Sequence, residues 1–266
     1  MIRYYGKKSF RAAVIHGGPG APGSVACIAR ELSKTFGVIE PIQSRYSVSE
    51  LIEELRQQLQ SVTQEPLTLI GHSWGAWLAV LYAAEYPRSV RQLVLIGGGP
   101  FEERFVPMIT ERRLSRLSST EANEFRTLLS TLGQDGDSGE AMRRLSQLVE
   151  KSDNVDPLTF ETDELDLLPV DGKMYASVWP EAAELRRNGK LAEYLNKLNC
   201  PVHVLHGESD PHPVEGIVEP LQENHVDFTC HVLKNSGHSP FKERQAYREF
   251  YRILMENLHE NKNGQK

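Results

Sequence analysis

The feature that most constrains this sequence is a glycine-flanked pentapeptide, Gly71-His72-Ser73-Trp74-Gly75, placed between two apolar segments. Residues 67–70 before it have the length and composition of a buried β-strand. Residues 76–86 after it form a richly apolar helical segment that stops at Pro87. A strand that turns at once into a buried helix is typical of a parallel sheet covered by helices. The pentapeptide therefore predicts an α/β fold.

Short β-rich runs and helical periodicities alternate on both sides of this motif. The helical signal is clearest after Ser47 and Glu50, which form a capping box, because Leu51, Leu55 and Leu59 then repeat at helical spacing. The other candidate strands are residues 2–5, 12–15, 37–39, 93–96, 202–205 and 228–233. We expect a mostly parallel central sheet with helices on both faces, and residues 2–5 as an edge strand.

The pattern changes between residues 101 and 199. Charged helical segments at 121–132 and 140–151 are followed by an acidic stretch at 161–166, and the strand signals resume only at 202. This organisation predicts one domain with an insertion. We assign residues 1–100 and 200–266 to the core and residues 101–199 to an inserted helical cap.

Composition narrows the range of partners. The formal net charge is -6 and no long lysine or arginine block occurs, which argues against a nucleic-acid surface. The first apolar run, at 12–15, is too short for a signal-peptide core or a membrane span. We expect a cytoplasmic protein that acts on a small molecule or a short peptide, without a membrane partner.

Ser73 is the candidate nucleophile. A serine hydroxyl reacts only when a tight turn lifts it clear of the sheet and a base can reach it, and glycines at positions 71 and 75 relieve the crowding of such a turn. An aspartate at position 73 would imply an alkyl-ester intermediate, whereas serine implies an acyl-enzyme. The sequence thus predicts acyl transfer, usually to water.

The base and the acid are expected at the ends of later strands. His238 lies in the loop after residues 228–233 and is the candidate general base. Asp210 follows residues 202–205 and is the candidate that orients the histidine, with Glu208 and Glu102 as alternatives. We interpret the neighbouring histidines as bystanders; they are His72, His206 and His212.

A second glycine-rich turn, His16-Gly17-Gly18-Pro19-Gly20, follows the run at 12–15. Backbone amides must converge on the oxyanion of an acyl-transfer intermediate, and glycines allow that close approach. We expect the amides of Gly18 and Trp74 to form this oxyanion hole.

Neither the cysteines nor the histidines have metal-ligand spacing. Cys27, Cys200 and Cys230 are an odd number of cysteines in apolar stretches, where cysteines are usually packing residues. His203 and His206 are three positions apart on a strand, so their side chains point to opposite faces. We expect no metal and no cofactor.

With these residues in hand, the chain resembles the α/β-hydrolase superfamily over nearly its whole length outside the cap. The turn at 16–20 and the Ser73-Trp74 pair are similar to the oxyanion and elbow motifs of the proline iminopeptidase family. The resemblance implies the same roles for Ser73, Asp210, His238, Gly18 and Trp74. Peptidases of that family bind a free amino terminus with cap glutamates, for which Glu181 and Glu215 are the candidates here.

The resulting hypothesis is a serine hydrolase for a small ester, a thioester or an amino-terminal peptide. The same triad also serves acyl transfer to another acceptor, or a cofactor-free haloperoxidase-like activity. A third alternative is a non-catalytic ligand receptor that keeps the hydrolase fold.

Overall fold

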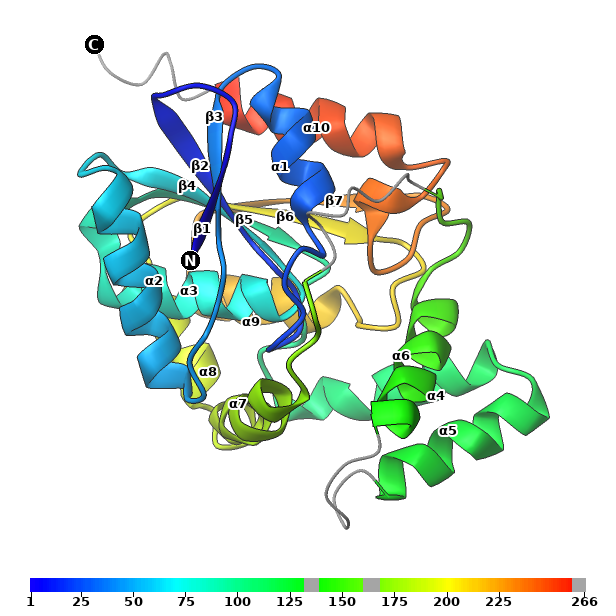
Figure 1. Cartoon of the computed structure of the whole chain (residues 1–266). Helices are drawn as coiled ribbons and strands as arrows, with labels where there is room; N and C mark the ends of the chain where they lie inside the picture. The colour runs from blue at the N-terminus through cyan, green and yellow to red at the C-terminus, as the bar shows by residue number, and fades with distance from the viewer. Residues whose placement is uncertain (132–138, 160–167, 260–266) are drawn as a thin grey trace.

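The structure is a computed structural model that describes residues 1–131, 139–159 and 168–259. Its sheet has seven strands in the order β1-β3-β2-β4-β5-β6-β7, with β1 antiparallel to β3 and all other neighbours parallel (Figure 1). The strands are β1 (Ile2–Tyr5), β2 (Phe10–Ile15), β3 (Gly37–Pro41), β4 (Leu67–His72), β5 (Val90–Ile96), β6 (Val202–Gly207) and β7 (Phe228–Leu233). The predicted α/β hydrolase architecture is confirmed.

Helices cover both faces of the sheet (Figure 1). Helices α1 (Ala26–Ser33) and α10 (Tyr247–His259) pack against one face. The other face packs α2 (Val48–Val62), α3 (Trp74–Glu85), α7 (Gly172–Arg187), α8 (Lys190–Glu193) and α9 (Glu215–Glu223). Strand side chains alternate between the two cores: Ala13 and Ile15 join the α3 side, whereas Ala12 and Val14 join the α10 side. Continuous apolar runs such as β2 are therefore needed at the centre of the sheet.

Helix α3 is apolar around its whole circumference, and every residue from Trp74 to Ala84 is buried. A helix of this kind is stable only when it is covered on all sides. The sheet covers one side of it, and α2 together with the predicted cap range covers the other. Burial of α3 thereby fixes the turn that begins it.

The helices of the range 101–199 fall into two groups. α4 (Val106–Ser115), α5 (Ser119–Thr131) and α6 (Gly139–Asp153) stand away from the sheet (Figure 1). They share a small apolar cluster made of Leu117, Ala122, Phe125, Leu145 and Leu148. In contrast, α7 and α8 contribute Met174, Val178 and Leu191 to the core around α3. The predicted acidic stretch at 161–166 lies outside the described residues.

Within the described residues, no helix has the length and apolar character needed to cross a membrane.

The Ser47 capping box is confirmed, because the Ser47 hydroxyl accepts a hydrogen bond from the Glu50 backbone N–H. Helix α1, which the sequence analysis did not predict, packs four side chains onto the sheet: Ala26, Ile28, Ala29 and Leu32.

Candidate active site

Ser73 occupies a strained turn between β4 and α3. Its backbone has φ 54° and ψ -118°, a region that residues other than glycine rarely adopt. The turn is held by a hydrogen bond of 2.9 Å from the Ser73 N–H to the carbonyl of Ile96. A Cβ on Gly71 would lie 2.2 Å from the Gly75 oxygen, and one on Gly75 would lie 2.3 Å from the Ile15 oxygen. Only glycine fits at 71 and 75, so the local sequence and this turn require each other.

The carboxyl ends of β4, β6 and β7 bring the three predicted catalytic residues to one edge of the sheet. Gly97, directly after the Ile96 that holds the Ser73 turn, has φ +50°, and a Cβ on it would lie 2.5 Å from the His238 oxygen and 3.3 Å from Asp210 Oδ2. In addition, His72 Nε2 lies 3.1 Å from the His238 carbonyl oxygen. The turn at Ser73 and the loop that carries His238 are therefore joined through His72 and Gly97.

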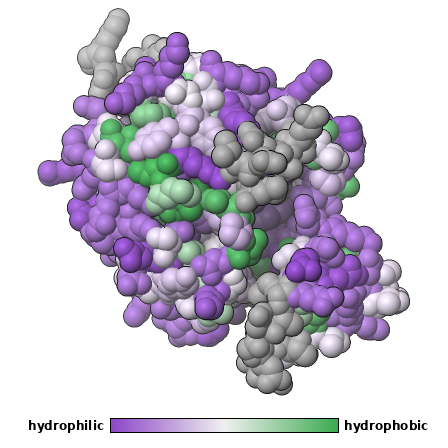
Figure 2. All heavy atoms as spheres, in the orientation of Figure 1, coloured by the Kyte–Doolittle hydropathy of each residue, from purple (hydrophilic) through white to green (hydrophobic). Residues whose placement is uncertain are grey.

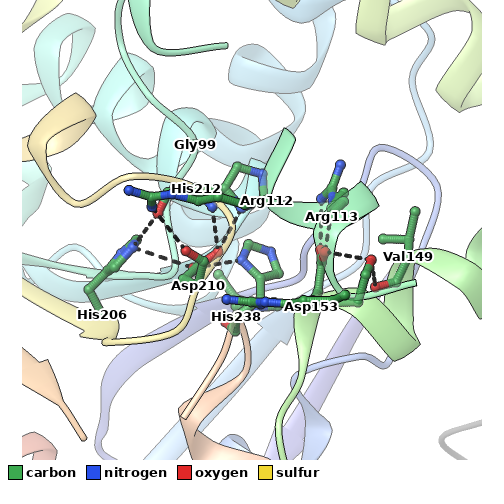
Figure 3. A network of polar contacts seen from close by, with 12 residues as sticks. Gly99, Arg112, Arg113, Val149, Asp153, His206, Asp210, His212 and His238 are labelled. Atoms are coloured by element: carbon green, nitrogen blue, oxygen red, sulfur yellow. Dashed lines mark hydrogen bonds and ion pairs between the residues drawn. The ribbon is translucent and has the colours of Figure 1, made fainter. Parts of the chain in front are cut away.

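His238 and Asp210 form a buried hydrogen-bonded pair. His238 Nδ1 lies 2.9 Å from Asp210 Oδ2, and the carboxylate is fully buried (Figure 3). Asp210 follows the carboxyl end of β6, and His238 follows that of β7, which is parallel to it. Of the three candidate acids, the structure brings Asp210 to the histidine. Glu208 is exposed and accepts from the Asn235 N–H, while Glu102 pairs with Arg104.

The protonation states follow from burial and from the shared carboxylate. Burial raises the pKa of Asp210, but the surrounding histidines, with His238 first, outweigh it and hold that pKa well below its usual value. Burial also lowers the pKa of His238, but the Asp210 carboxylate outweighs it and the net shift is upward from 6.5. Burial lowers the pKa of His212 to about 4. At neutral pH, Asp210 is therefore ionised and His212 is uncharged.

These pKa shifts predict a single ionisation in the rate of hydrolysis. Only uncharged His238 can accept a proton, so the rate should rise with pH through a midpoint above 6.5. His212 and His72 add no second limb near neutrality, because burial lowers the pKa of each. The measurement is kcat/KM for an aryl ester between pH 5 and pH 9, in about ten steps. A rate independent of pH in that range would contradict His238 as the base.

A second histidine shares the Asp210 carboxylate. His212 donates from both its backbone N–H and its ring Nδ1 to Asp210 Oδ1, each at 2.9 Å. His206 lies on the same side, with Nε2 2.8 Å from the His212 oxygen and 3.5 Å from Asp210 Oδ2 (Figure 3). The rings of His212 and His238 are 4.5 Å apart between centroids. Both histidines that we interpreted as bystanders therefore lie against the Asp210 carboxylate, and their part in catalysis stays a prediction.

Replacing His212 with phenylalanine should lower kcat about tenfold, because a hydrogen bond to a charged group contributes roughly 1.5–3 kcal/mol and the backbone donor remains. The ring contact with His238 is retained by this change, so the effect isolates the lost Nδ1 donor. The kinetic pKa and kcat are measured on the same aryl ester. His231→Phe is the matched control, since His231 lies within the edge strand β7, opposite Leu205 of β6. Equal kcat in both variants would show that the His212 ring has no part in positioning.

Comparisons with known proteins identify the family of this chain. A family model described as alpha/beta hydrolase fold matches residues 14–245. The chain belongs to this family. Among curated proteins, the Xenopus laevis protein named monoacylglycerol lipase abhd6-B is 26% identical over 206 residues, which are 75% of this chain and 58% of that protein. A protein of Mycoplasma pneumoniae named putative proline iminopeptidase is 29% identical over 97 residues, 32% of this chain and 31% of its own.

The match thus spans less than two thirds of either relative's length. Among solved structures, VinJ superimposes with a TM-score of 0.69 over 97% of this chain and 94% of VinJ, at 18% identity. Such a likeness supports the α/β hydrolase fold and leaves the substrate open.

The glycine-rich turn of this α/β hydrolase lies beside Ser73. A Cβ on Gly17 would lie 3.3 Å from the Cβ of Ser73, and Gly18 has φ +55°. Trp74 is the first residue of α3, so its N–H is among those that a helix leaves without an internal partner. Its indole N–H donates 3.0 Å to Gln43 Oε1, which anchors the side chain beside the turn. The turn that contains Gly18 therefore lies near Ser73, and the role of Gly18 and Trp74 as oxyanion donors stays a prediction.

Of the two predicted substrate-binding glutamates, Glu181 lies within α7 and Glu215 at the start of α9. Glu181 of α7 is exposed, and its Oε2 accepts 2.8 Å from the backbone N–H of Val48, the first residue of α2. Glu215 is exposed at the start of α9. The structure thus gives Glu181 a contact that joins α7 to α2, and the substrate role of both residues stays a prediction.

One group of potential metal ligands occurs among the described residues, made of Asp153, His212 and His238, with ligand atoms within 4.8 Å of one another. The Asp153 carboxylate and the Nδ1 atom of each histidine already have partners. Arg113 donates to both oxygens of Asp153 at 2.7 Å, and both imidazoles use Nδ1 on Asp210. This arrangement fits a hydrogen-bonded network, and the expectation that no metal is needed stays a prediction.

Proposed function

We propose that the chain is a serine hydrolase that acts through an acyl-enzyme on Ser73. The observation that carries the proposal is the buried Asp210–His238 hydrogen bond of 2.9 Å at the strand edge where Ser73 stands on a turn with φ 54°. A buried acid that orients an imidazole at the same sheet edge as a half-buried turn serine is the arrangement that nucleophilic catalysis uses.

In this mechanism, Ser73 Oγ attacks the substrate carbonyl carbon while His238 Nε2 accepts the hydroxyl proton. Asp210 keeps the Nδ1 proton in place and stabilises the imidazolium that forms. The amides of Gly18 and Trp74 donate to the oxyanion. His238 then passes its proton to the leaving group, and water, activated by the same histidine, releases the acyl group and regenerates Ser73.

A small ester is the substrate class that we favour. Three aromatic rings are stacked in a row from the core to the surface: Trp77 on Trp179 at 5.8 Å, and Trp179 on Tyr175 at 6.0 Å between centroids. Apolar side chains also gather in the middle of the face shown in Figure 2. Such surfaces suit an apolar acyl or alkyl group. One curated relative, which matches 75% of this chain, is named monoacylglycerol lipase abhd6-B.

An amino-terminal peptide is the second candidate, supported by the partial match to a protein named putative proline iminopeptidase. A charge-assisted hydrogen bond from a free ammonium to Glu181 or Glu215 would give a preference of about tenfold to a hundredfold over a blocked amine. Proline anilide and its acetylated form measure this preference directly. Equal turnover of the two removes the peptidase function.

The deciding experiment is a panel of aryl esters, thioesters and amino-acid anilides, run on the wild type and on Ser73→Ala. Product analysis in the presence of alcohols or amines separates hydrolysis from acyl transfer, and a halide-dependent peroxidation assay tests the haloperoxidase-like alternative. Labelling by a fluorophosphonate probe distinguishes all of these from a ligand receptor that lacks turnover. A wild type that neither labels nor hydrolyses any member would contradict the proposal.

The contact of Glu181 with α2 leads to a prediction on stability. Glu181→Ala leaves the first N–H of α2 without its acceptor and should lower the free energy of unfolding by about 0.5–1 kcal/mol. Urea unfolding of Glu181→Ala and of the control Glu184→Ala, an exposed residue paired with Arg187, measures the difference. If Glu181 also binds substrate, KM rises for the free amine alone. A rise for the acetylated substrate as well would indicate a structural role only.

A further inference from the structure

Glu243 is a buried carboxylate outside the triad. It lies five positions after His238 and is fully buried. Its Oε1 accepts from the backbone N–H groups of Val155 at 2.8 Å and Gly237 at 3.0 Å, and its Oε2 accepts from Asp156 N–H at 2.7 Å. A buried carboxyl group needs such partners, because an unpaired one costs several kcal/mol. Each of its oxygens is engaged with main chain.

The three amides belong to two segments that are far apart in the sequence. Gly237 directly precedes His238, whereas Val155 and Asp156 lie two and three residues after Asp153, which ends α6 and the cap's first group of helices. The backbone of His238 itself donates 2.7 Å to the carbonyl of Asp153. A Cβ on Gly237 would lie 1.9 Å from that same oxygen. The histidine loop is thus pressed against the chain that leaves α6, and Glu243 joins the two.

The cap side of this junction is anchored in turn. Arg113 of α4 holds both carboxylate oxygens of Asp153, the last residue of α6, and Arg113 is mostly buried (Figure 3). Any shift of α4 or α6 relative to the sheet must therefore move the carbonyl and amides that hold the His238 backbone.

We propose that Glu243 is a positioning residue, which fixes the His238 loop to the end of α6 and makes the placement of the catalytic imidazole depend on the cap. The inference rests on the proposed function, since it presumes that His238 is the base. Glu243 reaches no reacting atom and acts through the main chain on either side of it. A displacement of about 1 Å in a catalytic group is enough to lower a rate by about a hundredfold.

Glu243→Gln is the sharpest test. The amide keeps the volume but offers one acceptor oxygen where main-chain donors occupy both positions, so one N–H must face an NH₂ group. We expect the rate constant for labelling of Ser73 by a fluorophosphonate probe to fall about tenfold to a hundredfold. In that step the Ser73 oxygen bonds to phosphorus, fluoride leaves, and His238 takes the hydroxyl proton. The pH midpoint of labelling should also move lower, because a displaced His238 loses contact with the Asp210 carboxylate that raises its pKa.

A merely structural role gives a different result. The melting temperature would fall, but below the transition the folded protein would label at the wild-type rate with the wild-type pH midpoint. Arg244→Gln is the matched control, because it removes the exposed Arg244–Asp156 ion pair from the same junction without touching Glu243. Glu243→Asp, which keeps the charge with a shorter reach, is the second variant should the glutamine form fail to fold, and the same two shifts are expected from it.

The outcomes separate the two proposals. A wild type that does not label overturns the proposed function and the positioning role with it. A wild type that labels, together with folded Glu243→Gln or Glu243→Asp of unchanged rate and pH midpoint, overturns the positioning role alone. A slower rate with a lower pH midpoint in the Glu243 variants, and neither change in Arg244→Gln, supports it.

Discussion

Replacing Ser73 with alanine is expected to lower kcat by about 10⁶-fold, because the nucleophile and its base act as a unit and the loss of either removes the covalent route. The melting temperature should stay close to that of the wild type. The Ser73 side chain caps no N–H of α3, and the strain of φ 54° is the same for alanine as for serine. The measurement is a paired one, with turnover of an aryl ester and thermal unfolding determined on one preparation.

Ser73→Gly provides the matched control for strain. Glycine adopts the backbone at residue 73 without a Cβ penalty, so after its larger entropy loss on folding we expect a net stabilisation of about 1 kcal/mol. In a domain of roughly this size, that corresponds to a rise of about 2–4 °C in Tm. Both variants should be inactive while only the glycine form is more stable. Esterase activity retained in either variant would assign the nucleophile elsewhere.

The sheet could be predicted well because each buried parallel strand is a short apolar run. The predicted starts of β2 and β5 are late, at 12 and 93, whereas the strands begin at Phe10 and Val90. The missed residues include Arg11, Arg91 and Gln92. Their polar side chains interrupt the apolar pattern, although their backbones belong to the hydrogen-bonded strands. Helix α1 was not predicted for another reason: it has only eight residues, and Val25 before it provides no side-chain cap.

Some residues of the site could be predicted from a local sequence pattern, whereas others depend on contacts between distant parts of the sequence. The sequence indicates Ser73, Asp210 and His238 because each follows a strand in a recognisable turn, and the structure brings the last two into contact. Glu243 stands in the run Lys242-Glu243-Arg244, which has the composition of a solvated surface. Its burial depends on amides that precede it by 88 and 87 positions, so no local pattern could have revealed it.

Asp210→Asn is expected to lower kcat by about 10⁴-fold. The reason lies in the distribution of donors around the carboxylate. Asp210 Oδ1 accepts from the backbone N–H of His212, a donor that cannot reverse, and Oδ2 accepts from Nδ1 of His238. An asparagine has one oxygen, which must take the Oδ1 position, and its NH₂ group then faces His238.

To accept a hydrogen bond from that NH₂ group, His238 must leave Nδ1 unprotonated. Its proton then lies on Nε2, the atom that has to accept the hydroxyl proton of Ser73. The imidazole is then held in the tautomer that cannot act as the base. A small rate remains from molecules in which the ring leaves this arrangement, so the variant should retain more activity than His238→Ala.

The pH midpoint should also fall, since the carboxylate that raises the pKa of His238 is gone. Glu208→Gln, which changes an exposed carboxylate in the same loop, should leave kcat and the midpoint unchanged. Full activity of Asp210→Asn, with a loss in Glu208→Gln, would transfer the role of the acid to Glu208.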